Sequence, residues 1–69
     1  GPYRSDVHAV VVAPSPELLR LPDADSEALE IKLREGQRVR IVEARTDWMR
    51  IAVGENEGWL PREDAETVW

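Results

Sequence analysis

Residues 38–61 read RVRIVEARTDWMRIAVGENEGWLP, and the strand pattern of this segment indicates the fold class. Apolar and polar side chains alternate over residues 38–44 and again over residues 48–53, which is typical of strands that bury one face. A third, shorter strand covers residues 57–60 and stops at Pro61, because proline cannot donate to a sheet ladder. Polar turns separate the three segments, so the sequence predicts three consecutive strands.

The alternation assigns the side chains of this stretch to the two faces of the sheet. Met49 and Leu60 take inward positions, so the indoles of their neighbours Trp48 and Trp59 are predicted to face outward. The other inward positions are Val39, Ile41, Ile51 and Val53.

Further strands are predicted on the N-terminal side. Residues 7–13 (VHAVVVA) form a β-branched run that ends at Pro14, and residues 27–34 place an apolar residue at every second position. Two segments stay open: residues 17–21 fit either a short strand or a helical turn, and residues 67–69 can close the sheet as a last strand.

The length and the pattern together predict one small all-β domain. A chain of 69 residues forms a single domain at most, and no long helix is encoded. Residues 61–66 have room for one helical or 3₁₀ turn, with Pro61 suited to its first position. We expect a small five- to six-stranded barrel over residues 8–69, with a short 3₁₀ turn near the C-terminus, because closure hides sheet edges. Residues 1–7 begin with Gly-Pro, as a cleaved tag does, and are predicted to be a tag scar and linker.

Three segments, taken in order, resemble strand motifs of bacterial Src-homology-3 (SH3) domains. Residues 33–42 (LREGQRVRIV) resemble the L-x-x-G-x-x-V-x-V entry, residues 47–51 (DWMRI) the tryptophan strand, and residues 58–61 (GWLP) the G-W-V-P strand. The VVVAP opening and the GWLP ending also resemble the C-terminal module of tetratricopeptide-repeat proteins from bacterial aerotolerance operons. The resemblance covers residues 8–69 and implies an SH3-like barrel.

The resemblance implies binding rather than chemistry. It suggests a protein–protein interaction module of a larger, membrane-anchored bacterial scaffold at the cell envelope. Trp48 and Pro61 match the ridge positions that hold proline-rich ligands in eukaryotic relatives. Residues 9–13 lack both tyrosines of the family's first strand, and Asp64 stands where another tyrosine is expected. A proline-rich partner is therefore not expected.

The predicted partner-binding residues are Trp48, Arg50, Trp59 and Pro61. A two-residue turn at Gly54 would place Arg50 opposite Trp59, where the two side chains would form an exposed cation–π pair. In the alternative interpretation, the indoles only cover the rim of the barrel and stabilise strand pairing.

Charge is distributed unevenly along a chain whose net charge is −5. Residues 32–50 hold an excess of bases, which alternation places largely on the outer face of the sheet: Lys32, Arg34, Arg38, Arg40 and Arg50. An acidic loop holds Asp23, Asp25, Glu27 and Glu30. The bases could dock an acidic partner or the carboxylates of cell-wall peptides, or they could simply be solvated. Peptidoglycan binding and a structural, self-associating role are thus the alternative functions.

No catalytic, cofactor or metal site is predicted, and the domain is not expected to be an enzyme. His8 is the only histidine and the chain has no cysteine, which leaves too few metal ligands. No nucleophile motif surrounds Ser5, Ser15 or Ser26, and no glycine-rich phosphate loop occurs. The negative charge argues against nucleic acid, and no apolar run approaches the roughly 18 residues of a membrane span.

Overall fold

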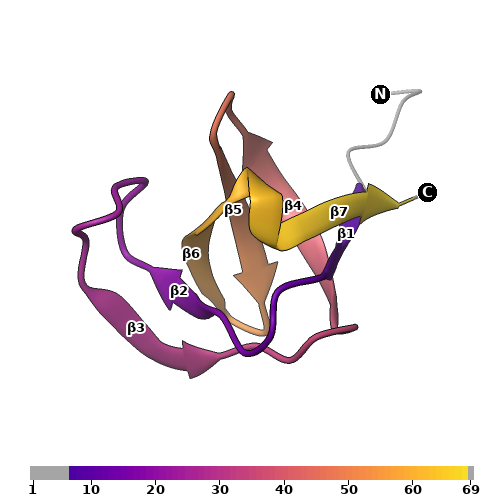
Figure 1. Ribbon diagram of the computed structural model, residues 1–69, viewed down its shortest axis with the longest axis horizontal. Coiled ribbons are helices and arrows are strands. Elements are labelled where there is room, and N and C mark those ends of the chain that lie inside the picture. The colour runs from indigo at the N-terminus through magenta and orange to yellow at the C-terminus, as the bar shows by residue number, and fades with distance from the viewer. Residues whose placement is uncertain (1–6, 69) are drawn as a thin grey trace.

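The computed structural model describes residues 7–68, which form seven strands and one 3₁₀ turn (Figure 1). The elements are β1 (His8–Val11), β2 (Glu17–Leu19), β3 (Ala28–Lys32), β4 (Arg38–Ala44), β5 (Trp48–Val53), β6 (Asn56–Pro61), η1 (Arg62–Asp64) and β7 (Ala65–Val68). No α-helix occurs in this part of the chain. The predicted all-β class and the 3₁₀ turn near the C-terminus are therefore confirmed.

The strand boundaries differ from the prediction in a few places. Both open segments are strands, β2 and β7, which raises the number of strands from five or six to seven. Strand β7 begins earlier than predicted, at Ala65, and Trp69 lies outside the described residues, as do residues 1–6 of the predicted scar and linker. Pro61 ends β6 and precedes η1, so it is not the first residue of the turn.

The strands form one antiparallel sheet in the order β3-β2-β6-β5-β4-β1-β7. Among the described strands, this hydrogen-bonded order ends at β3 and at β7. The sheet curls over itself (Figure 1), and side chains from both of its halves fill one shared interior. Prolines at positions 14 and 16 and a φ of 53° at Ser15 separate β1 from β2 along the chain.

The core follows the predicted alternation. Met49 and Leu60 are fully buried, as predicted, and Leu33 joins them from the segment after β3. The buried cluster consists of Ala9, Val11, Leu18, Leu33, Val39, Met49, Ile51, Leu60 and Ala65. Leu29, Ile31, Ile41 and Val53 pack against it while half-exposed. Among the described residues, no helix is long and apolar enough to cross a membrane.

A bulge in β4 changes which side chains share the outer face. Strict alternation after Val39 and Ile41 would turn Glu43 inward, but the register with β5 shifts between Ile41 and Glu43. Glu43 consequently pairs with Arg50 on the outer face. An acidic group is thereby placed beside the arginine without being buried.

Candidate partner-binding cleft

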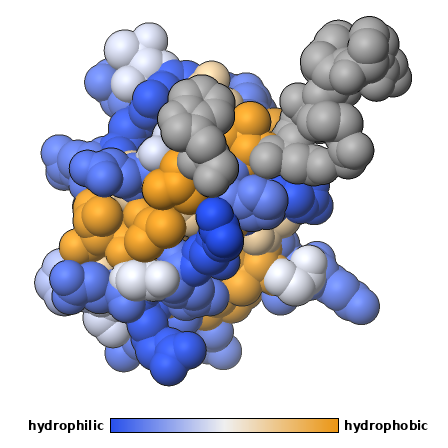
Figure 2. Space-filling model, turned by 90° about the vertical axis from the view of Figure 1, so that its right-hand side faces the viewer, coloured by the Kyte–Doolittle hydropathy of each residue, from blue (hydrophilic) through white to orange (hydrophobic). Residues whose placement is uncertain are grey.

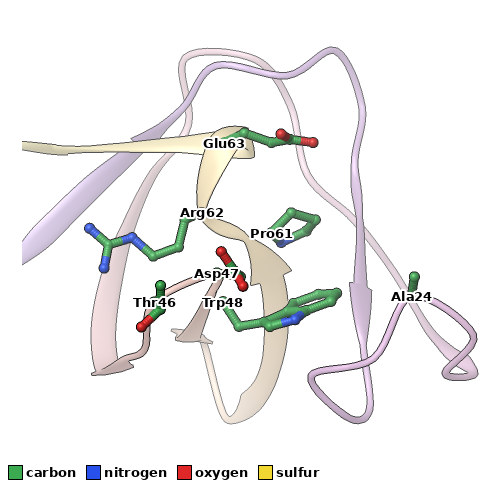
Figure 3. A pocket seen from close by; sticks show the side chains of 7 residues that line it. All are labelled: Ala24, Thr46, Asp47, Trp48, Pro61, Arg62 and Glu63. Carbon is green, nitrogen blue, oxygen red and sulfur yellow. The ribbon is translucent and has the colours of Figure 1, made fainter.

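An open cleft of about 480 Å³ lies where β5 begins and β6 ends (Figure 3). Its walls come from three segments far apart in sequence: the loop after β2, the turn before β5, and the β6–η1 junction. The lining residues are Ala24, Thr46, Asp47, Trp48, Pro61, Arg62 and Glu63.

Strand register brings Trp48 and Pro61 together at the cleft. The first residue of β5 and the last residue of β6 are direct cross-strand partners. Their neighbours Met49 and Leu60 are buried, so Trp48 and Pro61 lie on the opposite face of the sheet. Figure 3 shows the indole and the proline ring side by side at the cavity. An aromatic plane next to a rigid ring is a surface on which an extended chain can lie.

Acidic groups surround this apolar surface. Asp47 and Glu63 line the cleft, and Ala24 lies between the exposed Asp23 and Asp25 of the acidic loop. Because the amide of Asp25 donates to the Asp23 carboxylate over 2.9 Å, the loop is held as a compact turn. The cleft therefore has a negative rim.

Arg62 is the one base in the cleft lining, and it is tethered. Its guanidinium donates to the carbonyl oxygen of Arg45 at 2.8 Å, and its amide donates to the carbonyl oxygen of Asp47 at 3.0 Å. These contacts join η1 to the turn before β5.

Asp64, the last residue of η1, has a shifted pKa. Burial raises the pKa of its carboxyl above the ordinary value, and the charge of Glu63 adds to the shift.

Trp59 does not lie at an exposed surface, contrary to the prediction. Its side of β6 is covered because Leu19 of β2 pairs with it, and only 7% of the residue is exposed. The Arg45 guanidinium lies 4.6 Å from the centroid of the indole ring and covers it further. Trp59 thus stabilises the junction of three elements and is not accessible to a partner.

Arg50 lies opposite Trp59 as predicted, but the two do not form the predicted cation–π pair. The register of Val53 with Asn56 leaves a two-residue turn, in which Gly54 has a φ of 62°. The Arg50 guanidinium instead forms an ion pair with Glu57 at 2.6 Å and a longer one with Glu43 at 3.9 Å. Of the four predicted residues, only Trp48 and Pro61 line the cleft.

We expect Arg45→Ala to lower the free energy of unfolding by about 0.5–1 kcal/mol, because it removes both the cation above Trp59 and the ion pair with Glu43. Urea unfolding followed by tryptophan fluorescence measures this change. Arg38→Ala is the control, because it removes an exposed arginine side chain at the opposite end of β4. Equal losses in the two variants would contradict a stabilising stack on Trp59.

The predicted outer bases are exposed, with one exception. Lys32, Arg34, Arg38 and Arg40 are exposed, whereas Arg50 is half-buried between its two glutamates. Figure 2 shows that hydrophilic residues surround apolar ones on the face that β1 and β7 present.

Within residues 7–68, no group of three or more His, Cys, Asp or Glu side chains is arranged to hold a metal ion.

The fold and the cleft define a small all-β domain with a negatively rimmed surface groove. No family model matches the chain, and neither the curated proteins nor the solved structures give a significant match. The resemblance to bacterial Src-homology-3 domains therefore stays a prediction based on the sequence motifs.

Proposed function

We propose that this domain is a non-catalytic protein–protein interaction module, and that it binds an extended segment of a partner protein in the cleft. The observation that carries this proposal is the cross-strand pair of Trp48 and Pro61 on an open cavity wall. Tryptophan contributes a large contact area at small entropic cost, and it is enriched among residues that dominate binding energy.

The charges of the cleft specify the kind of segment. Asp47 and Glu63 line the same cleft as the indole, and Ala24 brings the turn that holds Asp23 and Asp25 to its edge. A lysine or arginine of the partner would lie over the indole face while its charge meets these carboxylates. Arg62 keeps its positive charge, but its guanidinium is held on the Arg45 carbonyl and points away from the Trp48 indole (Figure 3).

The proposed setting is a larger, envelope-associated bacterial scaffold protein, as the sequence resemblance implies. The module requires no cofactor for this role. Peptidoglycan peptides are the second candidate, and the exposed arginines of β4, Arg38 and Arg40, support it. Wall peptides carry carboxylates, so they would bind at β4 and avoid the negative cleft.

We expect the cleft to select peptides by charge. Short peptides that are identical except for a central Arg-Arg, Ala-Ala or Glu-Glu pair are titrated into the domain and followed by proton–nitrogen NMR. The Arg-Arg peptide should shift the indole signal of Trp48, and the Glu-Glu peptide should not. Raising the salt concentration should weaken the interaction.

Solubilised peptidoglycan fragments form a further arm of the same titration. Shifts confined to Arg38 and Arg40 with these fragments, and none at Trp48 with the Arg-Arg peptide, would replace the proposal by wall binding. Equal shifts of Trp48 with the Arg-Arg and Glu-Glu peptides would contradict the assigned charge preference.

A further inference from the structure

Strand β3 is an open edge of the sheet, paired only with β2 (Figure 1). The Leu33 amide donates to the Pro16 carbonyl, and the Glu27 carbonyl accepts from the Arg20 amide, so these groups point toward β2. Backbone direction alternates along a strand, which turns the N–H and C=O groups of Ala28, Glu30 and Lys32 toward the open edge. The register between β2 and β3 shifts between its two pairs, Glu17 with Lys32 and Leu19 with Ala28. Lys32 and Ala28 lie an even number of positions apart, so their backbone groups point to the same side of β3.

The side chains of β3 leave both charge and apolar surface at this edge. Glu30 and Lys32 are exposed, and among the described residues neither takes part in an ion pair. Leu29 and Ile31 are only half-buried where they pack on the core. An edge strand of this kind is a template for pairing with another strand.

We propose that β3 pairs antiparallel with β3 of a second copy of this chain, about a two-fold axis at Ile31. This register places Glu30 opposite the partner's Lys32, and two-fold symmetry repeats the contact. Ile31 then meets the partner's Ile31 as a close, non-hydrogen-bonded pair on the inner face. The backbone groups that face the open edge become the hydrogen-bonded pairs.

Charge selects this register over its neighbours. An axis at Glu30 would set two carboxylates opposite one another, and an axis at Lys32 would set two ammonium groups opposite one another. Registers shifted by a single residue would pair inner-face with outer-face side chains. Within β3, the axis at Ile31 is thus the register that joins opposite charges twice, and it sets no like charges opposite one another.

The other edge strand, β7, lacks this complementarity. Its residues Ala65–Val68 contain one charged side chain, Glu66, so antiparallel self-pairing has no opposite charge to join. The edge at β3 is therefore the one suited to a second copy. A single strand pair buries less than the roughly 1,200 Å² of a stable interface, so the dimer is weak and depends on concentration. Such a dimer presents two clefts.

Sedimentation equilibrium over a concentration series tests the proposal with charge-reversal variants. The native chain should dimerise reversibly, whereas Glu30→Lys and Lys32→Glu should each weaken self-association about tenfold by creating two like-charge contacts. An equimolar mixture of the two variants should restore dimers, because the register then joins opposite charges again. Glu66→Lys on β7 is the matched control and should associate like the native chain.

Two results would overturn the proposal: a native chain that stays monomeric at the millimolar concentrations used for NMR, or dimers that neither reversal weakens. NMR spectra of each variant establish that it is folded. The amide signals of Glu30 and Lys32 supply a second readout, since they should shift with concentration in the native chain. If the signals of Glu66 and its β7 neighbours shift instead, the assignment to β3 is wrong.

Discussion

Trp48→Ala should weaken binding of the Arg-Arg peptide at least about thirtyfold, which corresponds to the loss of a residue that dominates a binding site. The indole supplies the aromatic plane of the cleft wall, and its partner Pro61 cannot replace that area. Alanine also removes the face over which a lysine or arginine of the ligand would lie. Isothermal titration calorimetry measures the change in affinity.

The matched controls separate binding from folding. Trp48 is not part of the buried cluster, so the variant should keep the native pattern of amide shifts. Trp48→Phe keeps an aromatic plane and should retain part of the affinity. Leu21→Ala removes a large apolar side chain that is 56% exposed and lies outside the cleft lining, so it should bind normally. Normal binding by Trp48→Ala would show that the ligand lies elsewhere.

Alternation and turn chemistry predicted the central part of the fold. They assigned the inward residues of β5 and the register that sets Arg50 opposite Trp59, because a two-residue hairpin leaves one pairing. The same reasoning placed Trp48 on the outer face, and the family resemblance added Pro61 as its companion. These features depend on interactions close in sequence, which explains why a single chain reveals them.

The burial of Trp59 could not be predicted from alternation and turn chemistry. It depends on β2, a three-residue segment that the sequence allows to be either a strand or a helical turn. It also depends on Arg45, which follows β4 and whose guanidinium lies over the Trp59 indole. The bulge that turns Glu43 outward has no signal in the alternation of β4. Each of these features arises from tertiary contacts that override a local pattern.

The cleft residues that the sequence analysis missed divide into two groups. One group lies within two residues of Trp48 or Pro61, so a search of the segments flanking the predicted pair would have found it: Thr46, Asp47, Arg62 and Glu63. Ala24 has no such signal, because only the folded loop after β2 brings it to the cleft. The contribution of the loop after β2 to the rim therefore became evident from the structure alone.

Gly58→Ala should lower the free energy of unfolding by about 1–3 kcal/mol, as overpacking of a dense core does. Gly58 is buried in β6 where β2 crosses it. A Cβ at this position would lie 2.9 Å from the Leu18 Cβ, 3.0 Å from the Leu19 carbonyl oxygen and 3.2 Å from Leu29 Cδ1. The first two atoms cannot rotate away, so β2 itself would have to move.

This displacement has a specific signature. Because Leu19 covers Trp59, moving β2 would expose the indole and shift tryptophan emission to longer wavelength before the domain unfolds. Gly54→Ala is the control: a Cβ there meets no atom within 4 Å, and only its φ of 62° opposes the substitution, at about 1–2 kcal/mol. Urea unfolding measures both variants. A red-shifted native-state emission in Gly58→Ala, absent in Gly54→Ala, would tie the cost to the β2–β6 contact; identical native spectra would show that the sheet absorbs the added methyl without moving β2.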